Sequence, residues 1–154
     1  ISEFDDRAGF CEARPVFVSE VDHLEEKTGR CLCGAVVITV RGELGPVSYC
    51  HCSQCRRQTG LYCATTDAAV ADVDISGSDK IGSFRASPDA QRAFCRECGS
   101  PLYWKADGGS RLSLMAGLFP NPTGLKGGSH IFCADKGDFY EINDGLPQYP
   151  ASSS

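Results

Sequence analysis

The chain has 154 residues, a length that fits one compact domain and excludes a large multidomain protein. Its 15 lysines and arginines are outnumbered by 20 aspartates and glutamates, which gives a formal charge of -5. That sign is wrong for a protein that coats nucleic acid or an anionic lipid surface. We therefore expect neither a nucleic-acid partner nor a membrane partner.

Short runs of apolar and β-branched residues predict strands along most of the chain. They are separated by turn signals such as Gly42, Gly77-Ser78-Asp79 and Asp107-Gly108-Gly109. The predicted strands cover residues 35–40, 61–66, 70–75, 81–85, 91–94, 102–105, 111–115 and 130–134. The whole chain has 17 glycines and 8 prolines, which favour short elements joined by turns. Together, the predicted strands and turns indicate a mainly β fold of antiparallel strands in two layers, without long helices.

The predicted organisation is one domain over residues 25–150, an N-terminal segment over 1–24 and a flexible tail over 151–154. Glu3-Phe4 is what a common cloning site encodes, so we expect the first segment to be partly vector-derived. The start of the chain lacks the basic and apolar runs of a signal peptide, and no window approaches the roughly 18 apolar residues that cross a bilayer. We expect a cytoplasmic protein.

Ten cysteines are the unusual feature of the composition. Such a number indicates either disulfides in a secreted protein or thiolate metal sites in a reducing compartment, and spacing distinguishes the two. Cys31 and Cys33 form one knuckle and Cys95 and Cys98 another, each followed by a glycine that lets the backbone turn sharply. Together they predict a closed, four-thiolate zinc site that stabilises the fold. The alternative is a pair of disulfides.

A second cluster has three closely spaced thiols, Cys50, Cys52 and Cys55, and no partner knuckle. Three protein ligands leave one coordination position for water or substrate, as in catalytic zinc sites. We therefore interpret this triplet as the catalytic centre, followed by a helical turn over 53–58 that ends at Gly60. The alternative is a second structural site closed by one of four nearby residues, namely Cys63, His51, His130 or Cys133.

The remaining cysteines and the histidines have simpler interpretations. Cys11, Cys63 and Cys133 lie next to aromatic residues and are expected to be buried free thiols, with Cys63 near the triplet. His51 is enclosed by two candidate ligands, so its side chain is expected to point away from the metal. For His130 we expect a hydrogen-bonded strand residue.

Four motifs in this order resemble the glutathione-dependent formaldehyde-activating enzyme family, which includes centromere-protein-V-like proteins. They are the Cys31-Leu32-Cys33-Gly34 knuckle and the runs from Cys50 to Gly60, from Arg92 to Tyr103 and from His130 to Tyr149. The resemblance implies stacked antiparallel sheets similar to the Rab-associated zinc chaperone fold. It also implies two zinc ions per chain, a structural one at the four knuckle cysteines and a catalytic one at the triplet.

The resemblance further implies a carbon-sulfur lyase that forms or cleaves a thiol-aldehyde adduct, with glutathione or another small thiol as cosubstrate. Arg56, Arg57 and Arg92 would then neutralise the anionic metal site or bind glutathione carboxylates, or else be solvated surface charges. The chain departs from the family pattern over residues 117–122, where a loop that could face the substrate is apolar and rich in proline. The substrate is therefore left open, with a larger metabolite as a third possibility.

A hypothesis of another class is a non-catalytic zinc β module that binds a protein partner. Closure of the second site by a protein side chain would favour that alternative. For the enzyme, the expected partners are a small thiol and an aldehyde or thioether metabolite, and a homodimer is a further expectation.

Overall fold

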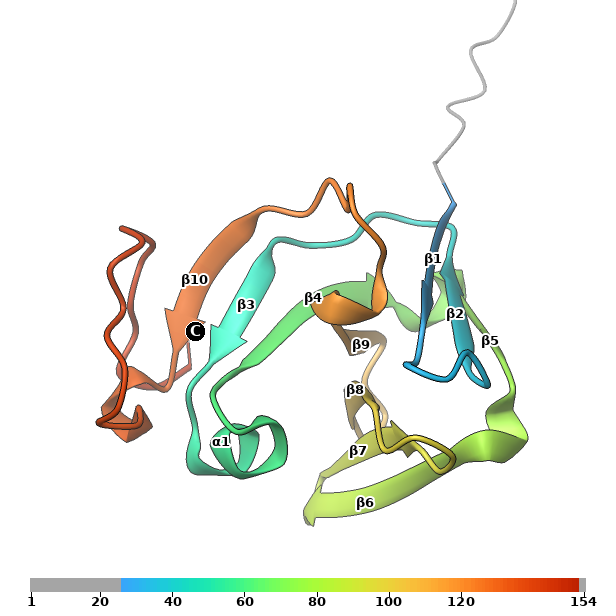
Figure 1. Ribbon diagram of the computed structural model, residues 1–154, viewed down its shortest axis with the longest axis horizontal. Coiled ribbons are helices and arrows are strands. Elements are labelled where there is room, and N and C mark those ends of the chain that lie inside the picture. Colours follow the sequence, from blue (N-terminus) through green and yellow to red (C-terminus); the bar gives the residue numbers. More distant parts are fainter. Residues whose placement is uncertain (1–25, 153–154) are drawn as a thin grey trace, which may run out of the picture.

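The computed structural model describes residues 26–152, which form ten strands in two sheets and one short helix, so the mainly β prediction is confirmed (Figure 1). The strands are β1 (Lys27–Arg30), β2 (Val37–Val40), β3 (Val47–Cys50), β4 (Cys63–Ala69), β5 (Val73–Ser76), β6 (Ile81–Ser87), β7 (Ala90–Cys95), β8 (Pro101–Ala106), β9 (Arg111–Met115) and β10 (Gly127–Ile131). The helix is α1 (Ser53–Thr59). Short 3-10 turns lie at Val70–Asp72, Ser78–Lys80, Ala116–Leu118 and Cys133–Asp135. The predicted N-terminal segment, with Cys11, lies outside the described residues.

The smaller sheet has the strand order β1-β2-β5 and is antiparallel. The larger sheet has the order β10-β3-β4-β9-β8-β7-β6, and Figure 1 shows it running from β10 on the left to β6 at the bottom. Its neighbours are antiparallel with one exception, because β10 pairs parallel to β3. Most of the domain separates these two strands in sequence, so no hairpin dictates their direction. The antiparallel prediction is corrected at this pair.

Two predicted strands are interrupted by a turn in the structure, and two observed strands were not predicted. The strand expected over 130–134 ends at Ile131, because Phe132 takes a left-handed backbone conformation with φ 56°. The strand expected over 70–75 begins only at Val73, after a 3-10 turn. Strands β1 and β3 were not predicted, since each is only four residues long and carries a weak alternating pattern.

A single cluster of buried side chains forms the core. Ile38 and Val40 of β2 alternate with less buried residues, as do Leu112 and Leu114 of β9, so one face of each strand supplies the core. Burying each of these side chains contributes about 1.5–3 kcal/mol. The same cluster includes four cysteines, Cys31, Cys55, Cys63 and Cys95, which places both cysteine clusters at the edge of rigid, packed structure.

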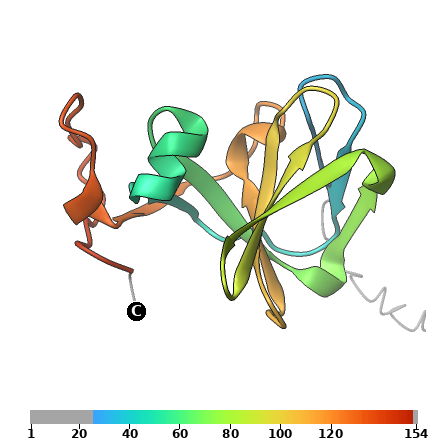
Figure 2. The same ribbon diagram turned by 90° about the horizontal axis from the view of Figure 1, so that it is seen from below.

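The predicted helical turn is confirmed as α1. Cys52 caps its first turn, because its Sγ atom accepts a hydrogen bond from the backbone N–H of Cys55 at 3.4 Å. Gly60 ends it in the left-handed conformation, φ 85°, and its N–H donates to the carbonyl of Arg56 at 2.8 Å. Figure 2 shows α1 between the C-terminal segment and the strands around β6. In residues 26–152 there is no helix that is long and apolar enough to cross a membrane.

Candidate functional site

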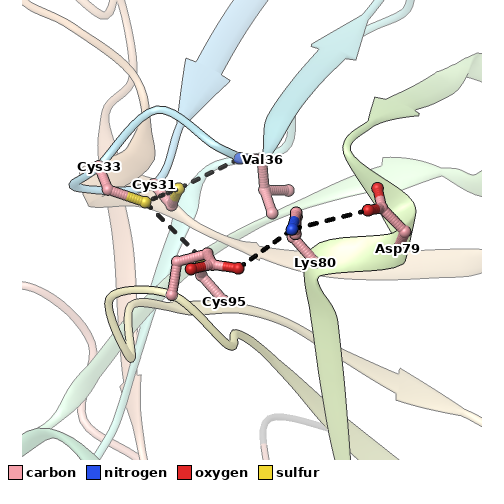
Figure 3. Close-up of polar contacts among 7 residues, drawn as sticks. Cys31, Cys33, Val36, Asp79, Lys80 and Cys95 are labelled. Atoms are coloured by element: carbon pink, nitrogen blue, oxygen red, sulfur yellow. Dashed lines mark hydrogen bonds and ion pairs between the residues drawn. The ribbon is translucent and has the colours of Figure 1, made fainter.

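The four knuckle cysteines come together although more than sixty positions separate the two pairs. The Sγ atoms of Cys31, Cys33, Cys95 and Cys98 all lie within 4.8 Å of one another. Cys33 Sγ is 3.6 Å from that of Cys31 and 3.8 Å from that of Cys95 (Figure 3). Four tetrahedral sulfurs bound to zinc at about 2.3 Å are separated by about 3.8 Å, so this donor set fits zinc. All nine cysteines of the described residues are free, and no disulfide joins the knuckles.

Glycines shape both knuckles as predicted. Gly34 and Gly99 have φ angles of 79° and 75°, a backbone region that glycine adopts without strain. Each donates its N–H back to the first cysteine carbonyl of its knuckle, Gly34 to Cys31 at 3.0 Å and Gly99 to Cys95 at 2.8 Å. The backbone therefore holds the thiols in position before any metal is considered.

A hydrogen-bonded environment also favours the charged form of one of these thiols. Hydrogen bonds from the side chain and the backbone of Ser100 lower the pKa of Cys98 to about 5. Beside the second knuckle, Lys80 forms ion pairs with Glu97 at 3.2 Å and Asp79 at 3.9 Å (Figure 3). These contacts attach the knuckle to the turn that precedes β6.

The triplet forms the second group of sulfurs. The Sγ atoms of Cys50, Cys52 and Cys55 lie within 4.8 Å of one another. Cys50 ends β3, Cys52 caps α1 and Cys55 is buried in the first turn of α1, so a strand end and a helix start present all three. Three thiols at this separation are a suitable donor set for a zinc ion with one further ligand position.

None of the four residues considered as a fourth ligand belongs to the triplet's group of ligand atoms. Among the residues that the structure describes, the group of ligand atoms within 4.8 Å contains neither Cys63, His51, His130 nor Cys133. Cys63 is opposite Cys50 across the β3–β4 pair, and its Sγ atom lies 3.3 Å from Met115 Sδ. The prediction of a buried thiol is correct for Cys63, which is 2% exposed, and wrong for Cys133, which is only half-buried.

The thiols around the triplet share negative charge unevenly. Hydrogen bonds from Cys50 and Cys63, together with the nearby Arg92, lower the pKa of Cys55 to about 2. The same hydrogen bond to Cys55, with burial, raises the pKa of Cys50, and the pKa of Cys63 is raised for the same two reasons. Of Cys50, Cys55 and Cys63, Cys55 is the thiol whose charged form these surroundings favour.

Arg92 of β7 is the arginine that lies at the triplet. Its side chain is buried, with 8% exposed, and its guanidinium donates to Cys55 Sγ at 3.5 Å. It also donates to the side-chain oxygens of Gln58 at 2.8 Å and Gln54 at 3.3 Å, so it ties α1 to the sheet. Arg56 and Arg57 are not among the described residues that line the cavity containing the triplet.

That cavity has a volume of about 310 Å³ and contains all three triplet cysteines and Cys63 in its wall. Trp104, Ile131 and Phe132 supply its apolar part, while Arg92 supplies the charge. The apolar loop over 117–122 does not line it; Leu118 and Phe119 are buried in the core, which corrects the expectation that this loop could face the substrate. Ile131 and Phe132 were not predicted as wall residues, because they lie at the end of β10, far in sequence from the cysteine motif.

Behind the triplet lies a chain of four hydrogen-bonded side chains. Asp144 accepts from His130 Nε2 at 2.8 Å, and His130 Nδ1 is 2.8 Å from His51 Nε2. Nδ1 of His51 is 2.5 Å from the hydroxyl of Tyr140. Because the carboxylate can only accept, His130 donates from Nε2. With both imidazoles neutral, His51 Nε2 donates to His130 Nδ1 and the Tyr140 hydroxyl donates to His51 Nδ1.

The histidine prediction is correct in its main point. His51 directs both ring nitrogens to Tyr140 and His130 rather than to the sulfurs, and burial, with the neighbouring His130, lowers its pKa. Tyr140 and Asp144 were missed as individual residues, although both lie in the C-terminal motif. Sequence spacing carries no signal for such a contact, because Tyr140 is 89 positions from His51.

A family model described as "Glutathione-dependent formaldehyde-activating enzyme" matches residues 26–135, which contain both cysteine clusters and Arg92. The chain belongs to this family. Within residues 26–152, the family match therefore includes every candidate metal ligand, whereas Tyr140 and Asp144 lie beyond it.

Two further proteins are similar to this family member. A protein of Schizosaccharomyces pombe named as an uncharacterized lyase is 28% identical over 123 residues, which are 77% of this chain and 87% of that protein. A crystal structure of a Rhodobacter sphaeroides protein superimposes with a TM-score of 0.53 at 22% identity and covers 79% of this chain and 98% of the other. The first supports lyase activity in general, and the second shows a shared fold.

Proposed function

We propose that this protein is a zinc-dependent carbon-sulfur lyase that cleaves or forms an adduct between a small thiol and an aldehyde, of the S-hydroxymethylglutathione type. The observation that carries the proposal is the triplet of Cys50, Cys52 and Cys55 in the wall of a cavity of about 310 Å³. Among the described residues, no fourth protein ligand joins these sulfurs. Family membership and the lyase name of the yeast relative support this class of reaction.

The two cysteine clusters have different roles in this proposal. Cys31, Cys33, Cys95 and Cys98 would hold a structural zinc with all four positions taken, and the triplet would hold the second. Zinc on the triplet would supply a position for a substrate thiol and lower its pKa, so that the substrate is a thiolate at neutral pH. Forming the adduct joins that sulfur to the carbonyl carbon and places a proton on the carbonyl oxygen, and cleavage reverses both changes.

The chain's own residues prepare the cavity for this chemistry. Arg92 offsets the negative charge of the thiolates through its bond to Cys55, and Gln54 and Gln58 hold its guanidinium in place. Trp104 and Phe132 limit the access of water, which strengthens electrostatic interactions inside the cavity. Cys63 completes the wall, and its Sγ atom contacts Met115 Sδ.

Glutathione or another small thiol is the proposed cosubstrate, and an aldehyde or thioether metabolite the second partner. The cytoplasm suits this chemistry, because thiols remain reduced there. The nine free cysteines of the described residues are consistent with that location.

The test counts zinc and follows the adduct on the same preparation. Native mass spectrometry is expected to find two zinc ions per chain, one of which is labile or carries added glutathione. Two-dimensional exchange NMR with carbon-13 formaldehyde and glutathione is expected to show exchange faster than the uncatalysed rate, and Cys52→Ala should abolish that increase. One tightly held zinc, insensitive to zinc resupply and thiol, with no exchange increase, would instead favour the protein-binding module.

A further inference from the structure

A second hollow, of about 480 Å³, adjoins the cavity of the triplet. It lies between α1 and the strands β6 and β7, and Phe84, Phe94 and Arg57 are among its lining residues. Gln54 and Arg92 line both the hollow and the cavity. Gln54 and Arg92 therefore form a wall common to the two spaces, and a ligand in the hollow lies next to the cavity that contains the triplet.

The apolar walls of this hollow are arranged by the β6–β7 pairing. Gly82 is opposite Phe94, and a Cβ atom at Gly82 would lie only 2.5 Å from Phe94 Cζ. The glycine thus provides the space in which the Phe94 ring lies. Phe84 stands on β6, the edge strand of the large sheet, and 65% of it is exposed. A ligand that covers this ring would remove apolar surface from water.

Hydrogen bonds hold the two sides of the hollow together without a ligand. Gln54 Nε2 on α1 donates to the carbonyl of Ala86 on β6 at 3.1 Å. Arg92 on β7 donates to Gln58 on α1 at 2.8 Å. The hollow is therefore preformed, which reduces the ordering cost of binding.

The charge of the hollow selects the kind of ligand. Arg57 and Arg92 are positive, and none of the described residues that line the hollow is acidic. Nε of Arg92 is buried and has no hydrogen-bond partner in the described part of the chain. An occupant with an apolar body and a carboxylate matches both the rings and the arginines.

We propose that this hollow binds the non-reacting part of the substrate thiol, and that this part is an aromatic or branched apolar group bearing a carboxylate. This inference rests on the proposed function, since the sulfur of the same molecule must lie at the triplet. The apolar group lies against Phe84 and Phe94, and the carboxylate meets Arg57. The thiol is thus more apolar than glutathione, while the reaction remains the thiol-aldehyde adduct chemistry proposed above.

The test compares two thiols that differ only in a phenyl ring, 2-sulfanyl-3-phenylpropanoic acid and 2-sulfanylpropanoic acid, by calorimetric titration of the zinc-loaded protein. The phenyl thiol is expected to bind about tenfold more tightly, because its ring is buried. Phe84→Ser should remove that advantage and leave the affinity of the ring-free thiol unchanged. Phe139→Ser is the matched control, because Phe139 is 61% exposed and does not line the hollow.

The carboxylate contact has its own variant and control. Arg57→Gln is expected to weaken the binding of both thiols about threefold or more, whereas Arg30→Gln, the same change on an exposed residue of β1, should have no effect. Equal affinity of wild-type protein for the two thiols would overturn the inference and leave the proposed function standing.

A sulfur-free probe separates the hollow from the triplet. Titration with 3-phenylpropanoate, followed by NMR, is expected to shift the side-chain amide signals of Gln54 and Gln58 in wild-type protein and not in Phe84→Ser. If neither thiol binds but this probe does, the proposed function fails and the apolar carboxylate site remains. No shift with the probe would overturn the inference whatever the thiols do.

Discussion

His51 Nε2 lies 2.8 Å from His130 Nδ1, and this contact joins the segment that carries the cysteine triplet to the parallel strand β10. His51 stands between two of the triplet cysteines, and His130 is opposite Tyr49 in the β10–β3 register. His130 also stacks on Tyr49 with ring centroids 4.9 Å apart. The C-terminal part of the domain therefore holds the backbone that presents Cys50 and Cys52.

Replacing His130 should show how much this contact contributes to the free energy of unfolding. His130→Phe keeps an aromatic ring on Tyr49 but leaves the N–H of fully buried His51 without an acceptor. An unsatisfied buried donor costs about 1–3 kcal/mol, so the free energy of unfolding should fall by that amount in urea denaturation. Tyr149→Phe, a change on the neighbouring segment, should leave it unchanged. A His130→Phe protein as stable as the wild type would show that the His51–His130 contact does not stabilise the fold.

Alanine at the two cysteine clusters should have different consequences. Cys95→Ala removes a buried ligand of the four-sulfur site, and structural zinc contributes on the order of 10 kcal/mol to folding, so this variant should be insoluble or unfolded. Cys52→Ala should remain folded and lose only the second zinc. Circular dichroism and zinc content measure both effects, with Cys133→Ala as a control outside either cluster. A soluble Cys95→Ala protein with wild-type stability would contradict the structural assignment.

Arg92 should influence how strongly the triplet holds metal. Arg92→Gln removes the positive charge that donates to Cys55 Sγ, so the zinc-bound thiolate loses a charge-assisted hydrogen bond and the triplet should hold zinc less tightly. Hydrogen bonds to charged groups are worth about 1.5–3 kcal/mol, which predicts zinc affinity at pH 7 at least about tenfold weaker in a chelator competition. Arg57→Gln makes the same change in net charge outside the triplet cavity and should leave zinc affinity near that of the wild type. Equal zinc retention by the two variants would refute the role of Arg92.

Asp144 should add stability that depends on pH. The hydrogen bond from His130 lowers the pKa of its carboxyl in the folded protein below the value in the unfolded chain, which is about 3.9. Its contribution is therefore complete above the unfolded value and is lost as the pH falls through the folded value. The melting temperature of the wild type should exceed that of Asp144→Asn at pH 7, and the difference should shrink below about pH 4. A constant difference for Asp144→Asn would contradict the prediction.

The sequence predicted the elements whose causes are local. The turn of α1 follows from a capping side chain at Cys52 and a left-handed glycine at Gly60, and both signals lie within nine residues of each other. The knuckles follow in the same way from closely spaced cysteines and the glycines Gly34 and Gly99. Such features depend on backbone conformation and on hydrogen bonds between residues that are close in sequence, so a short stretch of sequence is enough to predict them.

The sequence by itself thus determined the strand-rich class, the knuckles and the division of seven cysteines into a set of four and a set of three. Only the tertiary structure decided that Arg92 lies against Cys55, that His130 meets His51 and that Leu118 and Phe119 pack into the core instead of lining the cavity. These contacts depend on the order of strands in the large sheet, including the parallel β10–β3 pair. Strand order is set by the joint burial of many side chains, and no local pattern encodes it.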